Sequence, residues 1–259
     1  MAFTHSRFVW FEYITTDIPK AQGFFGELFN WKTQSMPAPT LPGGSYTMLA
    51  IGEHTQGGYI NPPPGAPTNA HWLPHLITDN AQATVTQITA NGGAIKLAPV
   101  KMGDMGTYAV VADPLGGVFA LWQPAKAEAG DFKGVDGAFC WNELYTEDPE
   151  RSAAFYKAIG AFTVEAMDMG GMGTYHVLKT DDKSRAGIMK APMPGMPQSW
   201  MPYVQVASTD ASIAKAKRLG ANIIMAGQDA ADVGRLGIFV DPQGAPLGVL
   251  QPDPKYLKK

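Results

Sequence analysis

Two acidic side chains interrupt apolar stretches of the sequence, and both could do chemistry. Glu12 stands in FVWFEYI at 8–14, and Glu143 stands in WNELY at 141–145. A carboxylate buried in a sheet is costly unless it is paired or hydrogen bonded. Such a glutamate is structural when it bonds a backbone group or a tyrosine, and it is half of an acid–base pair when it faces a histidine. Both roles remain open at this point.

His75 is the histidine that matches Glu12 in position. Each stands five residues before the polar residue that we expect to cap a helix. Side chains at alternate strand positions share a face, so Trp10 and Glu12 point the same way. We therefore expect Glu12 and His75 to converge on one cavity as the candidate catalytic pair. Glu143 and Tyr203 occupy the corresponding places in the second half of the chain.

Aromatic residues accompany these polar groups along the whole chain. Most tryptophans are expected in the core, because tryptophan buries a large apolar area. Trp72 and Trp200 follow proline-rich loops and are the better candidates for a cavity wall. The candidate ligand-binding residues are Trp10, Tyr46, Trp72, Tyr108, Trp122, Trp141, Glu143, Tyr175, Trp200 and Tyr203.

The sequence of the elements that must position these residues occurs twice in the chain. WFEYITTD at 10–17 is answered by WNELYTED at 141–148, 131 positions later (141 − 10 = 131). ADPLGGVFALWQP at 112–124 is answered by VDPQGAPLGVLQP at 240–252. The stretch AKAEAGDFKGVDG at 125–137 is small, charged and Gly-rich, which is typical of a linker. The predicted organisation is a first domain over 1–125, a linker over 126–137 and a second domain over 138–259.

A shorter repeat lies inside each half. In the first quarter a strand is predicted over 8–14 and a helix from 18, because Asp17 suits an N-cap and Pro19 a first helical turn. Three strand-like runs follow, at 31–36, 45–51 and 57–61. The second quarter repeats the order, with a strand at 72–78, a helix at 80–91 and strands at 94–99, 107–112 and 118–123. This order, found four times, predicts an α+β fold of mixed sheets with helices on one face.

Several of these motifs together resemble the vicinal oxygen chelate superfamily, which includes glyoxalase I, bleomycin-resistance proteins and extradiol dioxygenases. They are DIPKAQGFFGELF and DPLGG in the first half, and DPERSAAFYKAIG and DPQGA in the second. The resemblance covers nearly the whole chain. With W-x-E opening each half, it is closest to a tandem, two-domain glyoxalase-like or hydroxylase-like subgroup. It implies four βαβββ units paired into two cupped mixed-sheet domains, each around a ligand cavity.

The resemblance also implies metal-ligand positions, and the residues found there are of the wrong type. The first-strand ligand position falls on Trp10 and Trp141, and the last-strand position on Ala120 and Gly248. None of these side chains can coordinate a metal ion. We therefore expect no metal site and no cofactor, while a divalent metal at displaced ligands stays an alternative.

Composition narrows the range of partners. The formal net charge of −3, without a run of Lys or Arg, argues against nucleic acid. No apolar run approaches the ~18 residues of a membrane span. The single cysteine, Cys140, excludes an internal disulfide. We expect a cytoplasmic monomer or homodimer that meets a small molecule.

Two functions are compatible with this sequence. The first is a bleomycin-resistance-like protein that binds a small, partly apolar or aromatic molecule without the usual metal. The second is an enzyme, either a glyoxalase-like lyase or a hydroxylase- or dioxygenase-type oxidoreductase. It would use Glu12 and His75 as an acid–base pair, or a divalent metal. The missing metal ligands favour the first function, and the strand carboxylates keep the second open.

Overall fold

The computed structural model describes residues 6–38, 41, 44–126, 132, 134–193, 195–196 and 198–255. Part of the predicted linker, 127–131 and 133, lies outside the described residues, as do 194 and 197 of the second proline-rich loop.

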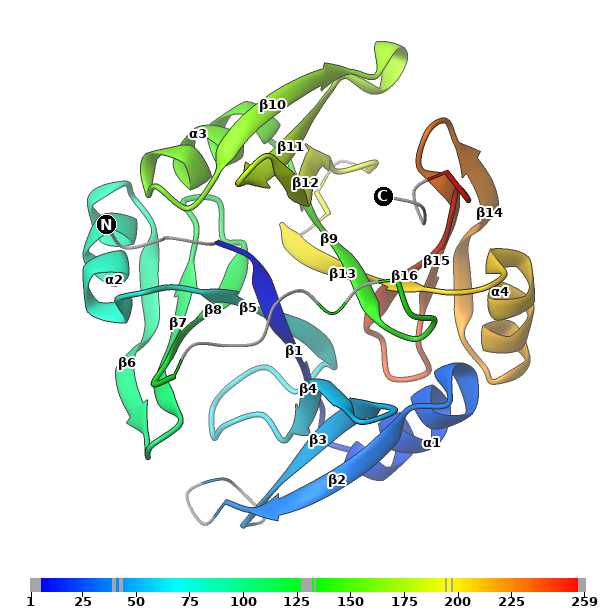
Figure 1. The fold of residues 1–259 in the computed structure, drawn as a ribbon, viewed down its shortest axis with the longest axis horizontal. Helices are drawn as coiled ribbons and strands as arrows, with labels where there is room; N and C mark the ends of the chain where they lie inside the picture. The colour runs from blue at the N-terminus through cyan, green and yellow to red at the C-terminus, as the bar shows by residue number, and fades with distance from the viewer. Residues whose placement is uncertain are drawn as a thin grey trace. The chain divides into compact units, whose positions relative to one another are not determined.

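The order of one strand, one helix and three strands occurs four times, as predicted (Figure 1). The first module is β1 (Phe8–Ile14), α1 (Ile18–Phe29), β2 (Lys32–Pro37), β3 (Ser45–Ile51) and β4 (His54–Ile60). The second is β5 (His71–Ile77), α2 (Ala81–Ala90), β6 (Ala94–Met102), β7 (Gly106–Ala112) and β8 (Val118–Pro124). The third is β9 (Phe139–Thr146), α3 (Pro149–Ala158), β10 (Thr163–Asp168), β11 (Thr174–Thr180) and β12 (Lys183–Lys190), with a short 3-10 turn η1 (Gly170–Met172). The fourth is β13 (Ser199–Gln205), α4 (Thr209–Arg218), β14 (Asn222–Ala230), β15 (Gly234–Val240) and β16 (Pro246–Pro252).

The strands form two mixed eight-stranded sheets, which confirms the predicted fold class. Their orders are β2-β3-β4-β1-β5-β8-β7-β6 and β10-β11-β12-β9-β13-β16-β15-β14. In each module the first strand pairs in parallel with the last, as β1 does with β4, while the last three strands pair antiparallel. A parallel pair needs a crossover connection, and the module's helix supplies it.

Each helix begins where the sequence places a capping side chain. Asp17 accepts a hydrogen bond from the backbone N–H of Lys20 at 3.0 Å, and Asp148 accepts one from Arg151 at 3.1 Å. Asn80 caps α2 in the same way through Ala83 N–H at 2.9 Å. These contacts satisfy backbone donors that a helix leaves unpaired in its first turn.

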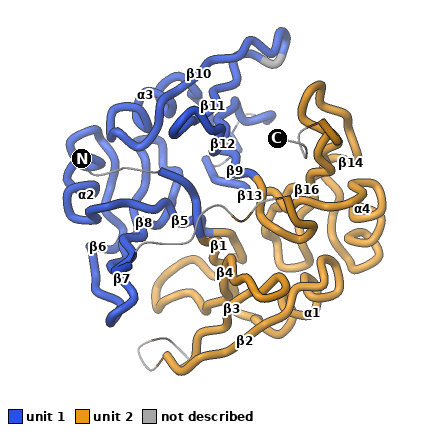
Figure 2. The backbone as a smooth tube through the Cα atoms, in the orientation of Figure 1, with its two compact units in different colours: residues 1–9, 73–130, 141–201 blue, residues 10–72, 131–140, 202–259 orange. Residues whose placement is uncertain are grey.

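Contacts between residues group the chain into two compact units, shown in Figure 2. Unit 1 comprises residues 1–9, 73–130 and 141–201, and unit 2 comprises 10–72, 131–140 and 202–259. Unit 1 thus holds most of the second and third modules, and unit 2 most of the first and fourth. The predicted boundaries at 125 and 138 follow the two sheets instead, and they remain a prediction.

Each unit has its own core, built on the helix-facing sides of its strands. In unit 1, Tyr156 of α3 packs 5.7 Å from the ring of Phe119 in β8, between ring centroids, and both side chains are fully buried. In unit 2, Phe24 of α1 packs 6.0 Å from Phe239 of β15. Each core therefore joins two modules, which are consecutive in unit 1 and are the first and the last of the chain in unit 2. No helix in the described ranges is long and apolar enough to cross a membrane.

Candidate functional site

Four groups of side chains lie on the strand faces opposite the helix-packed cores, one group in each module. We name each group by its polar first-strand residue. The Glu12 face is Trp10, Glu12, Ile14, Tyr46 and Gly58, and the His75 face is His75, Tyr108, Val110, Ala120 and Trp122. The Glu143 face is Trp141, Glu143, Tyr145, Tyr175 and Gly187, and the Tyr203 face is Tyr203, Leu236, Ile238, Gly248 and Leu250.

The His75 face, in unit 1, combines an imidazole with two aromatic rings. His75 pairs in parallel register with Ala120, and Tyr108 lies directly opposite Trp122 in the neighbouring antiparallel pair. The ring centroids of His75 and Tyr108 are 5.3 Å apart. His75 is buried, whereas Tyr108 and Trp122 are only half-buried. The face therefore presents partly accessible aromatic surface beside a buried titratable group.

A glycine lets Trp122 lie against the adjoining strand. A Cβ atom built on Gly106 would lie 2.9 Å from the Trp122 indole and 2.3 Å from the backbone oxygen of Gln123. Any larger residue there would push the indole away or open the β7–β8 pairing.

The Glu143 face, also in unit 1, is a hydrogen-bonded relay. Trp141 Nε1 donates to the Tyr175 hydroxyl at 3.1 Å, and that hydroxyl donates to Glu143 Oε1 at 2.7 Å. Tyr145 donates its hydroxyl to the other carboxylate oxygen, Oε2, also at 2.7 Å. Both oxygens of the buried carboxylate thus accept a phenol proton, which offsets the cost of its burial.

The phenol of Tyr175 is held in its neutral form. Burial and then the negative charge of Glu143 raise the pKa of Tyr175 well above its ordinary value. Tyr175 is consequently a hydrogen-bond donor to Glu143 and not a base. Its hydroxyl sits over Gly187, where a Cβ atom would lie only 1.9 Å from the hydroxyl oxygen.

The Glu12 face, in unit 2, repeats part of this arrangement. Trp10 Nε1 donates to the Tyr46 hydroxyl at 2.8 Å, and a Cβ atom on Gly58 would lie 2.2 Å from that oxygen. The same arrangement of an indole, a phenol and a glycine beneath the phenol therefore occurs on both the Glu12 face and the Glu143 face. The residue that differs is Ile14, which stands where the Glu143 face has Tyr145.

The Tyr203 face, in unit 2, is the apolar counterpart of the His75 face. Tyr203 pairs in parallel register with Gly248, and a Cβ atom on Gly248 would lie 2.2 Å from the tyrosine ring. The ring therefore covers the strand position where relatives with a metal would carry a ligand. Leu236 and Leu250 stand opposite each other where the His75 face has Tyr108 and Trp122.

The structure separates two of the expected ligand-binding residues from the others. Trp72 packs against Tyr13 at 4.8 Å and Phe25 at 5.4 Å in the unit 2 core, and Trp200 belongs to the unit 1 core. Three positions separate each tryptophan from the polar residue of its strand. The tryptophan and the polar residue of each strand therefore lie on opposite faces of the sheet.

Glu12 belongs to unit 2 and His75 to unit 1. Both are buried, with exposed fractions of 5% and 6%. Their convergence on one cavity stays a prediction.

Sequence reasoning missed two buried aspartates, one in each unit, that join two modules of that unit. Asp113 accepts hydrogen bonds from the Tyr156 hydroxyl at 3.1 Å and from Gln198 Nε2 at 2.7 Å. Asp241 accepts one from the Tyr13 hydroxyl at 2.5 Å. Burial raises the pKa of each carboxyl above its ordinary value, against the opposing effect of these hydrogen bonds. The D-P-x-G motif marked both aspartates, but nothing in the sequence named their distant partners.

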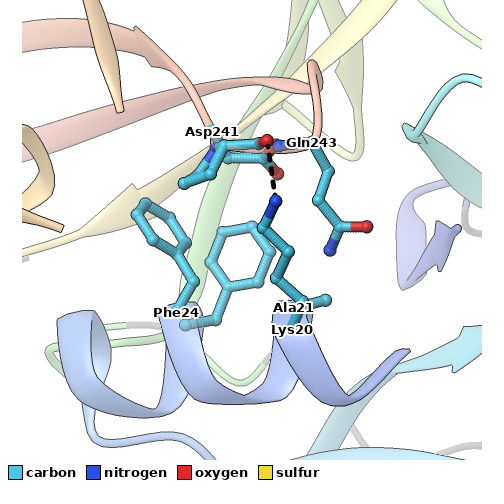
Figure 3. A pocket seen from close by; sticks show the side chains of 7 residues that line it. Lys20, Ala21, Phe24, Asp241 and Gln243 are labelled. Atoms are coloured by element: carbon cyan, nitrogen blue, oxygen red, sulfur yellow. Dashed lines mark hydrogen bonds between the residues drawn. The ribbon is translucent and has the colours of Figure 1, made fainter. Parts of the chain in front are cut away.

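A small pocket adjoins Asp241 in unit 2 (Figure 3). It is lined by Lys20, Ala21, Phe24, Phe25, Asp241, Pro242 and Gln243, and its volume is about 10 Å³. Lys20 Nζ donates to the Pro242 carbonyl at 3.4 Å across it. That volume suits one water molecule and no organic ligand.

The residues present do not fit the metal that the fold family implies. Trp10, Ala120, Trp141 and Gly248 offer no donor atom for it, and the ring of Tyr203 covers the last of these positions. Within the described part of the chain, no group of three His, Cys, Asp or Glu side chains could hold a metal ion.

Comparison with solved structures places this fold among glyoxalases and extradiol dioxygenases. The Mn(II)-bound glyoxalase from Novosphingobium aromaticivorans aligns with a TM-score of 0.64 at 15% identity, over 96% of this chain and 82% of that one. Homoprotocatechuate 2,3-dioxygenase from Brevibacterium fuscum, as an E323L mutant, aligns with a TM-score of 0.67 at 14% identity, over 97% and 73%. At these identities the likeness concerns the fold alone.

Sequence relatives complete the assignment. A Mycobacterium tuberculosis protein named "Putative glyoxylase CFP32" is 34% identical over 248 residues, covering 95% of each chain. The anthracycline biosynthesis protein DnrV of Streptomyces peucetius is 26% identical over 258 residues, covering 93% of this chain and 92% of that one. No protein-family model matches the chain. The chain belongs to the vicinal oxygen chelate superfamily, among its glyoxalase-like members.

Proposed function

We propose that this protein binds a small, partly aromatic molecule at the His75 face and does so without the metal usual in its superfamily. One observation carries the proposal. Ala120, the position of the usual carboxylate ligand, has His75, Tyr108 and Trp122 as neighbours on its face, and of these three only His75 is a usual metal ligand. Aromatic surface and one imidazole are suited to hold a flat organic molecule and to orient it by a hydrogen bond.

The half-buried state of Tyr108 and Trp122 supports this use of the face. By contrast, Phe119 on the opposite side of β8 is fully buried in the core. A ligand ring could stack on the exposed part of the indole with the offset geometry that aromatic pairs prefer. The name of the relative DnrV, an anthracycline biosynthesis protein, supports a flat polycyclic compound as the ligand class.

A second function, catalysis, is favoured by the relative named as a glyoxylase. In that case Glu12 and His75 would share the work of acid and base, with the imidazole moving the proton. The buried position of both side chains would favour proton exchange with a bound substrate over exchange with bulk water. The alternative of a divalent metal would need donors other than those at the usual positions.

Equilibrium dialysis tests the proposal. The purified protein is dialysed against 1,4-dihydroxyanthraquinone, once with EDTA and once with an equimolar mixture of Fe, Ni, Zn and Mn, and bound dye and metals are measured. We expect saturable dye binding that is the same in both conditions, and no stoichiometric metal. Dye binding that requires a metal, or one bound metal per chain, would overturn metal independence, and the absence of dye binding would overturn the ligand class.

A further inference from the structure

The His75 face and the Tyr203 face are two copies of one design, 128 positions apart (203 − 75 = 128). Their strand registers match, since His75 pairs with Ala120 as Tyr203 pairs with Gly248. The side chains do not match. Tyr108 and Trp122 of the first copy are replaced by Leu236 and Leu250 in the second. The first copy is thus aromatic with an imidazole, and the second is aliphatic with a phenol.

The second copy is also filled by its own side chain. The ring of Tyr203 lies so close to Gly248 that even a methyl group at that position would overlap it, and Tyr203 is only 3% exposed. The first copy has no such requirement, because Ala120 already carries a Cβ atom beside His75. A ring that occupies the surface of its own strand pair leaves that surface unavailable to a ligand ring.

The Glu12 and Glu143 faces also differ, in the hydrogen-bond donors that surround the carboxylate. On the Glu143 face, Tyr145 and Tyr175 each donate to one oxygen of the carboxylate. On the Glu12 face, Ile14 replaces Tyr145 and has no proton to donate. The later copy thus carries a hydroxyl, absent at the matching place of the first copy, that binds the carboxylate from within its own strand.

We infer that the two halves have divided their roles. The His75 face is the ligand-binding copy. On the other two faces the ring of Tyr203 covers its own strand pair and the Glu143 carboxylate is bound by its own tyrosines, so these faces stabilise the fold. Each chain would then bind one ligand and not two. The inference rests on the proposed function for the identity of the binding face, but the structural role of the later copies is a separate claim with its own measurement.

The test exchanges residues between the copies. Trp122→Leu gives the His75 face the residue of the matching place on the Tyr203 face, where leucine is accommodated. Leu250→Ala is the control in the other copy. With 1,4-dihydroxyanthraquinone as the probe, we expect one bound dye per chain. The dissociation constant should increase at least tenfold for Trp122→Leu and change less than twofold for Leu250→Ala. Two equivalent dyes per chain, or equal losses in the two variants, would overturn the inference.

A second measurement needs no ligand. Glu143→Gln keeps the shape of the side chain but removes an oxygen acceptor from the tyrosine relay, so we expect a fall in Tm of more than about 3 °C. Glu165→Gln, which removes an exposed carboxylate of the same module, is the control and should leave Tm within about 1 °C. An unchanged Tm for Glu143→Gln would overturn the structural role of this face, whatever the dye does. No dye binding together with the expected fall in Tm would end the proposed function and leave the structural role of the Glu143 face standing.

Discussion

Removing one buried hydroxyl, by Tyr156→Phe, should destabilise unit 1 by about 2.5–6 kcal/mol. The Tyr156 hydroxyl donates to Asp113 Oδ2 at 3.1 Å and accepts from Trp200 Nε1 at 3.1 Å. All three side chains are buried. Loss of a hydrogen bond to a charged group costs about 1.5–3 kcal/mol, and an indole N–H left without an acceptor adds about 1–3 kcal/mol. The removed hydroxyl leaves little empty volume, so the cavity contribution is small.

Unit 2 already contains the arrangement that Tyr156→Phe would create in unit 1. Phe25 stands at the place of Tyr156, 131 positions earlier (156 − 25 = 131), and is fully buried. Trp72, the counterpart of Trp200, has a buried Nε1 with no hydrogen-bond partner among the described residues. A phenylalanine ring therefore fits this site, and the cost of the substitution should come from hydrogen bonding and not from packing.

Urea unfolding followed by far-UV circular dichroism would measure the change. Tyr13→Phe, which removes the donor to Asp241 in unit 2 and leaves no indole behind, is the matched variant. We expect it to cost less, about 1.5–3 kcal/mol. A loss below about 1 kcal/mol for Tyr156→Phe would refute the reasoning, because it would mean that water or a neighbouring group replaces the hydroxyl without cost.

Three further predictions concern single sites. Burial raises the pKa of Asp113, so its stabilising contribution is complete below its ordinary value of 3.8 and is lost as pH rises through the raised value. The stability of the wild type relative to Asp113→Asn should therefore fall as pH rises from 4 to 7, as Tm measurements at each pH would show. Gly187→Ala should cost about 1–3 kcal/mol by displacing the Tyr175 hydroxyl, while Gly171→Ala, with open space at its Cβ, should cost far less in the same thermal melts. Asp17→Ala should lower the unfolding free energy by about 1 kcal/mol through loss of the α1 cap, and an unchanged value would contradict that role.

The fold could be predicted because its determinants are local and repeated. Asp17 and Pro19 mark the start of α1, and the motif spacing shows that the same start recurs in the third module. Strand alternation places Trp10 and Glu12 on one face, and the hydrogen bond from Trp10 to the cup-facing Tyr46 agrees with that placement. The helix predicted at 80–91 ends within a residue of α2, and the strand predicted at 57–61 begins three residues earlier, at His54.

The site was harder to predict because its contacts depend on distant strands. Strand alternation could have excluded Trp72 once His75 was assigned to the cup, since three positions separate them. The role of Tyr145 was also within reach, because it stands two residues after Glu143 and so shares its face. By contrast, the contact between Asp113 and Tyr156 joins residues 43 positions apart in different modules. No local pattern encodes such a pairing.

The D-P-x-G motif shows why the family could be recognised while the activity stayed open. Asp113 Oδ1 accepts the backbone N–H groups of Leu115 at 3.0 Å and Gly117 at 2.9 Å, which shapes the turn before β8. Its other oxygen accepts the hydroxyl of Tyr156, from a different module. The same carboxylate thus forms a turn and joins two modules of one core, and Asp241 does both in unit 2. Such a residue is required by the fold whatever is bound on the opposite face of the sheet. Ala120 and Gly248, where the resemblance places the usual metal ligand, lie seven residues further along and take no part in this turn.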